Sequence, residues 1–298
     1  MKKLFFVYIL ALVSIFVYSC DEVKYEKPLV VTSTFPLYTI LKEIVGNELS
    51  IEYLVPTGAS PHTYQPKPSD AKKATTALAL FYTADNLDGW ISEIADKKRI
   101  KLIDYVPLDK IIFFSCGHDH SNGNHEEHEH EVDPHFWLDP LTVKSMLDTL
   151  VFELSALYPD GKKKFVKNAS VFSAKLDSIH KEALSLLNPI AESVVFMHHP
   201  SFNYLLNRYN LYYGGAIEES PGKEPSPKFI SDLVELIKQS GAKAIFSEPQ
   251  LSSKVAEVIA KESGVKLLEL NPEGSSNGAQ TYREIIINNA KILKSGLE

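Results

Sequence analysis

Histidines are the residues of this sequence whose type and spacing could do chemistry. The 298-residue chain contains ten of them, unevenly distributed. Three lie in separate segments, namely His62, His135 and His199, whereas five crowd into one short stretch: His118, His120, His125, His128 and His130. Imidazole is the commonest protein ligand for zinc, and a stable site needs three or four ligands that arrive from separate elements. Metal binding is therefore the first hypothesis.

The three separate histidines lie where an α/β fold would place a ligand. His62 lies in a loop stiffened by three prolines, between a predicted strand and a predicted helix. Aromatic residues follow His135, and His199 comes directly after a predicted strand. Open α/β sheets bind ligands at the carboxyl ends of their strands. A lone loop histidine is more often a surface or hydrogen-bonded residue, so the residues alone leave that interpretation open.

Two alternating periodicities predict the elements that must position these side chains. Short apolar runs predict buried strands at residues 29–32, 51–55, 78–82, 194–197, 211–214, 244–246 and 266–270. Amphipathic stretches predict helices at residues 38–45, 70–76, 87–96, 141–157, 227–239, 253–263 and 282–294. Strand followed by helix, repeated, indicates parallel sheets covered by helices. Residues 160–188 carry no strand signal, so we expect one helix there, roughly 42 Å long, that joins two lobes.

The first twenty residues form a separate unit. Lys2 and Lys3 precede an uncharged apolar run over residues 4–17, which ends at Val17-Tyr18-Ser19-Cys20. This order predicts an export signal, and its end resembles the lipobox of bacterial lipoproteins, although Tyr18 departs from the small residue preferred there. We therefore expect a signal peptide at residues 1–19, a diacylglycerol on Cys20 and a tether at residues 20–28. A retained transmembrane helix is the alternative, but the run is shorter than the roughly 20 apolar residues that span a bilayer.

The net negative charge of the chain makes some classes of binding partner unfavourable. The formal net charge is -7, and loss of Lys2 and Lys3 with the signal makes it -9. This balance disfavours nucleic acid and broadly anionic surfaces as partners. Once Cys20 is acylated, Cys116 is the only cysteine left, so packing rather than a disulfide must stabilise the fold.

Nearly the whole mature sequence resembles the cluster-A metal-binding lipoproteins of ABC importers, in their ZnuA-like zinc-binding branch. The resemblance rests on Pro61-His62, Pro66-Lys67-Pro68-Ser69-Asp70, Asp133-Pro134-His135-Phe136-Trp137, His199-Pro200-Ser201-Phe202-Asn203-Tyr204, Glu224-Pro225-Ser226 and Phe246-Ser247-Glu248-Pro249-Gln250. It implies an α/β protein of two lobes, each a mostly parallel sheet flanked by helices, joined by one long rigid helix. The lobes would cover residues 29–158 and 189–298, the linking helix residues 159–188, and the metal would lie between the lobes.

By position, the resemblance assigns the metal ligands to His62 and His135 from the first lobe and His199 from the second. Relatives commonly have an aspartate where this chain has Asn271, which offers only a neutral oxygen or orients a water. That change favours zinc, which three imidazoles and a water satisfy, over manganese, which depends on carboxylate oxygen. Glu248 is a second candidate for the fourth ligand or for a partner of a ligand histidine, and an ordinary turn residue is the alternative.

The resemblance also implies a function and a place in the cell. The chain would be a monomer, periplasmic or at the cell surface, held to a bacterial membrane by its Cys20 lipid. It would deliver zinc to an ABC permease and its ATPase. The acidic, His-rich stretch at residues 118–133 predicts a loop that binds metal weakly, either for transfer to the site or as a sensor of excess, with a merely solvated insertion as the alternative.

Three other functions stay open at this point. A manganese-binding homologue and a metal-binding surface adhesin would both fit the resemblance. Three histidines with an open fourth position also describe catalytic zinc, so a zinc hydrolase is the competing class. The sequence contains no His-Glu-x-x-His helix, glycine-rich phosphate loop or nucleophile elbow, and we therefore expect no enzyme.

Overall fold

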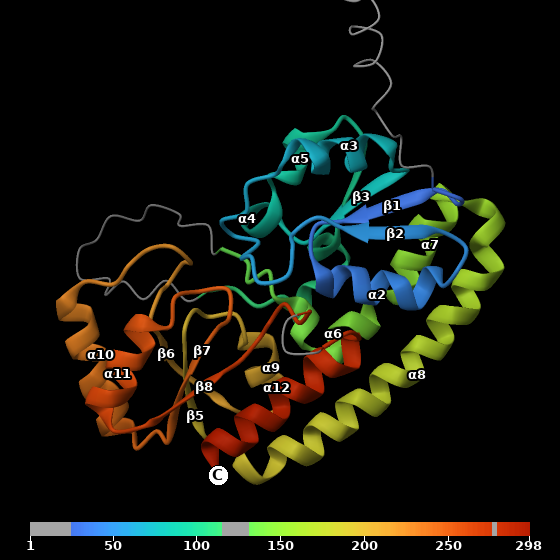
Figure 1. Ribbon diagram of the computed structural model, residues 1–298. Helices are drawn as coiled ribbons and strands as arrows, with labels where there is room; N and C mark the ends of the chain where they lie inside the picture. The colour runs from blue at the N-terminus through green and yellow to red at the C-terminus, as the bar shows by residue number, and fades with distance from the viewer. Residues whose placement is uncertain (1–24, 115–130, 276–278) are drawn as a thin grey trace, which may run out of the picture.

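Two parallel four-stranded sheets form the framework of the protein in a computed structural model that describes residues 25–114, 131–275 and 279–298 (Figure 1). The strand orders are β2-β1-β3-β4 in the first lobe and β6-β5-β7-β8 in the second, and all neighbours are parallel. The predicted signal peptide, Cys20 and the five histidines of the His-rich stretch lie outside the described residues. Within them, no helix is both long and apolar enough to cross a membrane.

Each lobe alternates strands with helices. The first contains β1 (Leu29–Thr32), α2 (Phe35–Val45), β2 (Ser50–Tyr53), α3 (Pro68–Thr76), β3 (Ala79–Tyr82), α4 (Asp85–Asp88), α5 (Ile91–Ile94), β4 (Lys98–Lys101), α6 (Pro140–Ser145) and α7 (Leu147–Leu157). The second contains β5 (Val194–Met197), α9 (Asn203–Arg208), β6 (Tyr212–Ala216), α10 (Pro227–Ser240), β7 (Ala244–Ser247), α11 (Lys254–Ser263) and β8 (Lys266–Glu269). The linking helix α8 (Lys162–Leu187) and the last helix α12 (Tyr282–Leu297) run side by side past both lobes (Figure 1).

The predicted fold class is confirmed, with differences in detail. The linking helix has 26 residues and a 3-10 turn at each end, at Pro159–Gly161 and Asn188–Ile190. One predicted helix divides at Met146 into α6 and α7, and another divides into α4 and α5. Strand β4 and the short helix α9 were not predicted.

Local sequence signals explain where the elements begin and end. All four residues of β1 are buried, as expected for a central strand with a neighbour on each side. Helix α10 begins with Ser226, whose hydroxyl accepts a hydrogen bond from the Phe229 amide, and it ends at Gly241 in the left-handed conformation. Helix α12 begins with a capping box between Thr281 and Glu284.

A shared core makes the two lobes one packed unit. Helix α8 packs against α2, α6 and α7 of the first lobe and against α12. Its buried residues include Phe165, Phe172 and Leu176. They belong to one continuous hydrophobic cluster that also contains Val30 of β1 and Phe246 of β7. Wide hinge opening would expose this core, so motions between the lobes are expected to be small.

Polar bonds also cross from the segment around residues 133–139 to the second half of the chain. Asp139 accepts two hydrogen bonds from Arg208 Nε at 2.9 and 3.0 Å and one from Arg208 Nη2 at 2.6 Å. The Trp137 ring nitrogen donates to the Pro272 carbonyl at 2.9 Å, and the Tyr282 hydroxyl donates to the Trp137 carbonyl at 2.7 Å. The segment that carries His135 is therefore fixed to the second lobe and to α12, although it belongs to the first lobe in sequence.

The Arg208–Asp139 pair can be tested by substitution. Arg208→Met would leave the buried Asp139 carboxylate without its cation, and the free energy of unfolding should fall by about 2 kcal/mol, allowing for the partly exposed arginine. Arg283→Met is the matched control, because the ion pair of Arg283 with Glu182 lies at the surface. Its effect in urea denaturation should stay within about 0.5 kcal/mol. Equal losses for the two variants would contradict a special role for the Arg208 pair.

Candidate metal centre

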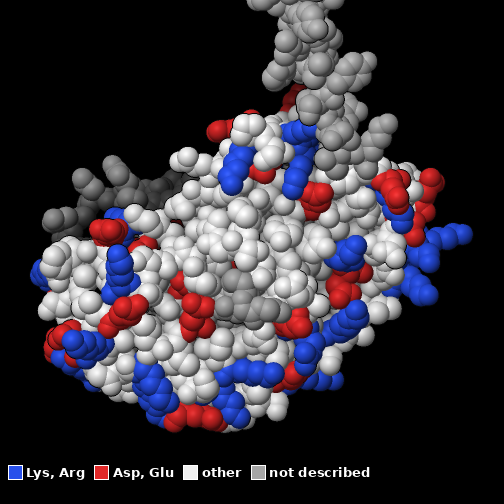
Figure 2. All heavy atoms as spheres, viewed as in Figure 1, with Lys and Arg blue, Asp and Glu red and all other residues white. Residues whose placement is uncertain are grey.

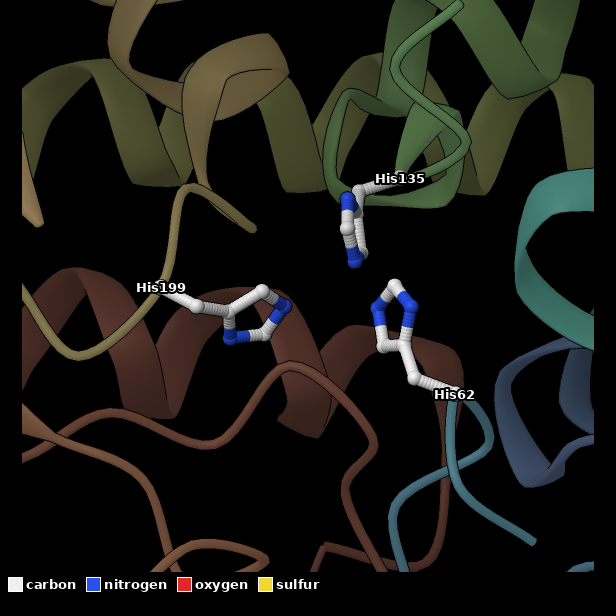
Figure 3. Close-up of side chains that lie close together, drawn as sticks. All are labelled: His62, His135 and His199. Atoms are coloured by element: carbon white, nitrogen blue, oxygen red, sulfur yellow. The ribbon is translucent and has the colours of Figure 1, made fainter. Parts of the chain in front are cut away.

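Three histidine rings from distant parts of the chain meet between the lobes (Figure 3). His62 comes from the loop between β2 and α3, His135 precedes the 3-10 turn Phe136–Leu138, and His199 follows β5. The ring centroids lie 5.2 to 5.5 Å apart, and one ligand atom of each ring lies within 4.8 Å of the others. Tetrahedral zinc with bonds of 2.0–2.1 Å would draw such atoms to about 3.3 Å from one another. The arrangement fits a metal ion after a small closure.

The sheet topology explains why these rings meet. The strand order reverses beside β1 in the first sheet and beside β5 in the second, and ligands of open α/β sheets bind at such switch points. His199 follows the carboxyl end of β5, and His62 follows that of β2. The two carboxyl edges face each other across the cleft, so side chains far apart in sequence become neighbours.

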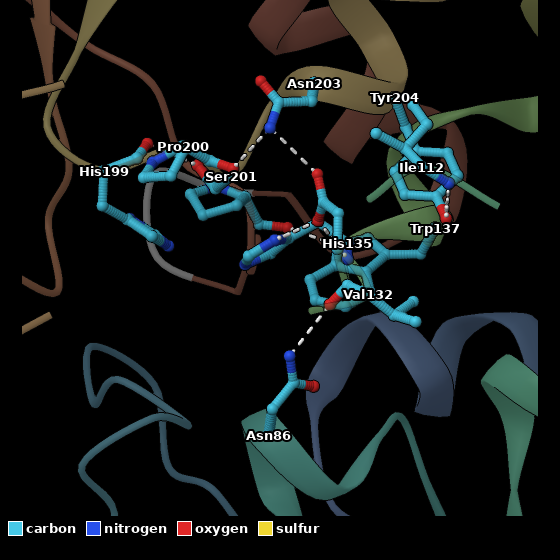
Figure 4. A network of polar contacts seen from close by, with 12 residues as sticks. Asn86, Ile112, Val132, His135, Trp137, His199, Pro200, Ser201, Asn203 and Tyr204 are labelled. Atoms are coloured by element: carbon cyan, nitrogen blue, oxygen red, sulfur yellow. Dashed lines mark hydrogen bonds and ion pairs between the residues drawn. The ribbon is translucent and has the colours of Figure 1, made fainter. Parts of the chain in front are cut away.

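His135 is oriented by a buried carboxylate. Asp133 Oδ1 lies 2.8 Å from His135 Nδ1 and accepts a hydrogen bond from the His135 amide at 2.9 Å. Asn203 of the second lobe donates to Asp133 Oδ2 at 3.1 Å and to the Pro200 carbonyl at 3.2 Å (Figure 4). Because Asp133 engages Nδ1, the other ring nitrogen is left for a ligand. The same network joins the segment of His135 to that of His199.

His199 also has a buried acidic neighbour. Glu248 Oε1 lies 2.8 Å from His199 Nδ1 and accepts a hydrogen bond from the Ser201 hydroxyl at 2.8 Å. Neither ring nitrogen of His199 has a hydrogen-bond partner among the described residues. Glu248 therefore lies beside a ligand candidate, where it could serve as fourth ligand or as partner of His199, and both roles stay predictions.

Electrostatics favour the uncharged form of two of the rings, His62 and His135. Burial lowers the pKa of His62 to about 2, and the neighbouring His135 and His199 rings add to the shift. Burial also lowers the pKa of His135 well below its usual range. His62 Nε2 is buried without a hydrogen-bond partner in the described part of the chain. Unsatisfied buried polar atoms each cost about 1–3 kcal/mol, a penalty that a bound cation would remove, because neutral imidazole is the form that binds metal.

Glu273 is a residue of the site that the sequence reasoning missed. It lines the same small cavity as the three histidines, together with Glu248 and Gln250. The cavity measures about 10 Å³, which is room for one water-sized sphere. Burial, with help from Asp88 and Glu248, raises the pKa of Glu273 to about 8. Glu273 lies two positions after Asn271, in the sequence Asn-Pro-Glu-Gly, and this nearness to a ligand candidate could have identified it.

Asn271 shapes the turn that presents Glu273. Its Oδ1 atom accepts hydrogen bonds from Gln250 Nε2 at 2.8 Å and from the amides of Glu273 and Gly274 at 3.1 Å each. Gly274 adopts a φ of +67°, and a side chain there would lie 2.7 Å from Ile285, so only glycine fits. Asn271 is absent from the residues that line the cavity in the described part of the chain.

The adjacent His198 lies outside the cluster of three. Its ring is fully buried, and Nε2 lies 3.5 Å from Glu218 Oε1. The predicted choice of His199 over His198 therefore agrees with the position of the rings. The base of the His-rich stretch lies close to the site, because Phe113 and Val132 form an antiparallel bridge one residue before Asp133.

Comparison with known proteins agrees with this geometry. The sequence is 30% identical over 295 residues to the zinc-binding lipoprotein AdcA of Streptococcus pneumoniae, covering 95% of this chain and 59% of AdcA. The chain thus spans about three fifths of that relative's length. It is 28% identical to the high-affinity zinc uptake system protein ZnuA of Bacillus subtilis, covering 92% of this chain and 89% of ZnuA.

Solved structures show the same fold. A crystal structure of ZnuA superposes with a TM-score of 0.78 at 25% identity and covers 92% of this chain and 100% of its own. The laminin-binding protein Lmb of Streptococcus agalactiae, described as having adhesin and metal-transporting activity, superposes with a TM-score of 0.75 at 25% identity and covers 91% of this chain and 100% of its own. The family model for zinc-uptake complex component A, periplasmic, matches residues 30–296. The chain therefore belongs to the family of zinc-uptake component A proteins.

Proposed function

We propose that this protein captures a zinc ion outside the cytoplasm with His62, His135 and His199 and delivers it to an ABC permease powered by an ATPase. The observation that carries the proposal is the convergence of three imidazoles around one cavity, with a lowered pKa for His62 and His135. Imidazole ligands suit zinc, whereas manganese depends more on carboxylate oxygen. The names of the relatives AdcA and ZnuA support the same metal.

The lipid anchor on Cys20 is part of the proposal. Its support is the apolar run that ends at this cysteine and the description of the pneumococcal relative as a lipoprotein. The lobes and linking helix with the boundaries given above would form a monomer on a bacterial membrane, periplasmic or at the cell surface. The His-rich stretch would collect zinc weakly near the site, because its stem ends beside Asp133.

A hydrolase is the competing function for three histidines on a metal. The cavity measures about 10 Å³, which is room for one water-sized sphere, and this favours a single ion over a larger substrate. Glu248, the candidate base, is buried and already accepts the Ser201 hydroxyl. Both observations support a protein that encloses an ion over one that turns over a substrate.

Capture would depend mainly on the loop of His62. The segments of His135 and His199 share the hydrogen-bonded network of Asp133 and Asn203, so those two rings hold their positions together. His62 lies on a separate loop, where the Trp90 ring nitrogen donates to the Pro61 carbonyl at 3.2 Å. Small closure of this loop would complete the site. Release would require the permease to distort it.

The ligand assignment is tested by His199→Ala in the mature chain. Tight zinc binding should weaken by at least about 100-fold in calorimetric competition with a zinc chelator, because one of three ligands is lost. Weak binding by the His-rich stretch should remain. The control is His180→Ala on α8, whose ring stacks on Tyr209 away from the site. Unchanged tight binding in His199→Ala would mean that other groups hold the metal.

We infer that Glu273 supplies the fourth ligand, with Glu248 and Asn271 supporting the histidines and the turn. Glu273→Gln should lower the zinc affinity about 10- to 100-fold and weaken the visible absorption of the cobalt-substituted protein. The free energy of unfolding without metal should not fall, because the change removes a buried carboxyl group whose ionisation is disfavoured. Glu218→Gln, beside His198, is the control and should leave zinc affinity unchanged. Unchanged zinc affinity in Glu273→Gln would mean that water or Glu248 supplies the fourth ligand.

A further inference from the structure

The first lobe has a distinct base at the amino ends of its strands, opposite the metal site. The described chain starts there, at Tyr25, whose hydroxyl donates to Glu52 at 2.7 Å. Lys27 donates to the Asn47 carbonyl in the turn after α2. Asn168 of α8 donates to the Ile44 carbonyl in that same region at 3.0 Å. The start of α8 therefore lies beside the point where the chain enters the first lobe (Figure 1).

Four lysines cover the start of α8. Lys162, Lys163, Lys164 and Lys167 are all exposed, and we call them the basal lysines. Figure 2 shows lysine and arginine side chains projecting where α8 begins, with some acidic side chains next to them. Over the described residues, none of the four forms an ion pair with a carboxylate. Their charges are therefore directed to solvent.

The stability of helix α8 does not explain the positive charges of the basal lysines. The amino end of a helix carries a partial positive charge, so cations there oppose the helix dipole. The first turn of α8 contains no acidic residue to compensate. Glutamine at these positions would propagate the helix as well as lysine does. A cluster that the helix does not need is more readily explained by a partner outside the molecule.

The length of the tether limits how far the first lobe can lie from the membrane. Only residues 21–24 separate Cys20 from Tyr25, which is already fixed to the lobe. A fully extended chain spans at most about 3.6 Å per residue, so the Tyr25 Cα can lie no more than about 18 Å from the Cys20 Cα. With a lipid on Cys20, the base must stay close to the bilayer surface. Lysine side chains at the base can then come within the Debye length, about 8 Å at physiological salt.

We propose that the base of the first lobe is a membrane-facing surface, with the basal lysines against anionic lipid headgroups; this rests on the proposed lipid anchor at Cys20. The net charge of the whole chain is negative, but a screened interaction senses the nearest charges. Near the tether, Lys24, Lys27 and the four basal lysines outnumber Asp21, Glu22, Glu26 and Asp160. Near an anionic bilayer each lysine strengthens association about fivefold. The anchor holds the protein at the membrane, and the lysines set the orientation in which it rests between encounters with the permease.

The experiment uses the mature chain, residues 20–298, with Cys116→Ser. Its Cys20 thiol is coupled to a maleimide-headgroup lipid in vesicles of phosphatidylcholine, with or without phosphatidylglycerol. A membrane-impermeant amine reagent then labels the lysines, and peptide mass spectrometry measures the extent. Labelling of the basal lysines should fall at least about threefold on the anionic vesicles, and the difference should vanish near 1 M salt. Lys254 and Lys261 on α11, exposed on the other lobe, should label equally on both vesicles.

A charge-matched pair of variants completes the test. Lys→Gln at all four basal positions should abolish the protection of Lys27 on anionic vesicles. Lys→Gln at Lys228, Lys238, Lys254 and Lys261, which gives the same net charge, should preserve it. Equal labelling of the basal lysines on the two kinds of vesicle would overturn the proposal, as would equal behaviour of the two variants.

Two further measurements separate this proposal from the proposed function. Zinc affinity should be unchanged in the basal variant, whereas failure of the metal assignment would appear only in the His199→Ala experiment. Thiol coupling makes the vesicle result independent of acylation in cells. The mass of the chain extracted from cell membranes tests the lipid itself, and absence of the diacylglycerol would remove the anchor and this proposal together.

Discussion

Three imidazole rings packed against one another, with nitrogens of His62 and His199 that have no hydrogen-bond partner among the described residues, are the constraint on which the structure depends. Such an arrangement is unfavourable without a cation, so it persists only where the surroundings prevent the rings from turning away. The shared hydrophobic core, the 26-residue linking helix and the Asp133 network provide that rigidity. In the proposed site, these unpartnered nitrogens favour a bound cation over a larger ligand.

The division into two lobes by sequence differs from the division that the hydrogen bonds make. His135 precedes the linking helix in the chain, yet its segment is hydrogen-bonded to Asn203, Arg208 and Pro272. The proposed site therefore consists of two histidines in one bonded unit and a third histidine on a separate loop. For the proposed transport role this division is useful, because one short loop can adjust while the core between the lobes stays closed.

Much of the fold could be predicted from sequence, because buried strands such as β1 and amphipathic helices such as α8 have strong periodicity. Strand β4 was missed because it is a charged edge strand in which only Ile100 is buried. The three histidines were found because the resemblance gave them a common place. Glu273 was missed because only the folded turn at Asn271 brings its side chain to the cavity. The Arg208–Asp139 pair joins residues 69 positions apart, which no local pattern reveals.

The wide separation of the three ligands along the chain has a consequence for the lifetime of the protein. An unfolded chain cannot bring together side chains from the loop after β2, the segment between the two sheets and the loop after β5, so tight zinc binding would require the native state. Each tenfold rise in free zinc above the dissociation constant then adds about 1.4 kcal/mol to the stability of the native state. Proteases that cleave transiently unfolded chains would degrade the empty carrier faster than the loaded one, and the amount of carrier would follow the metal supply without a separate sensor.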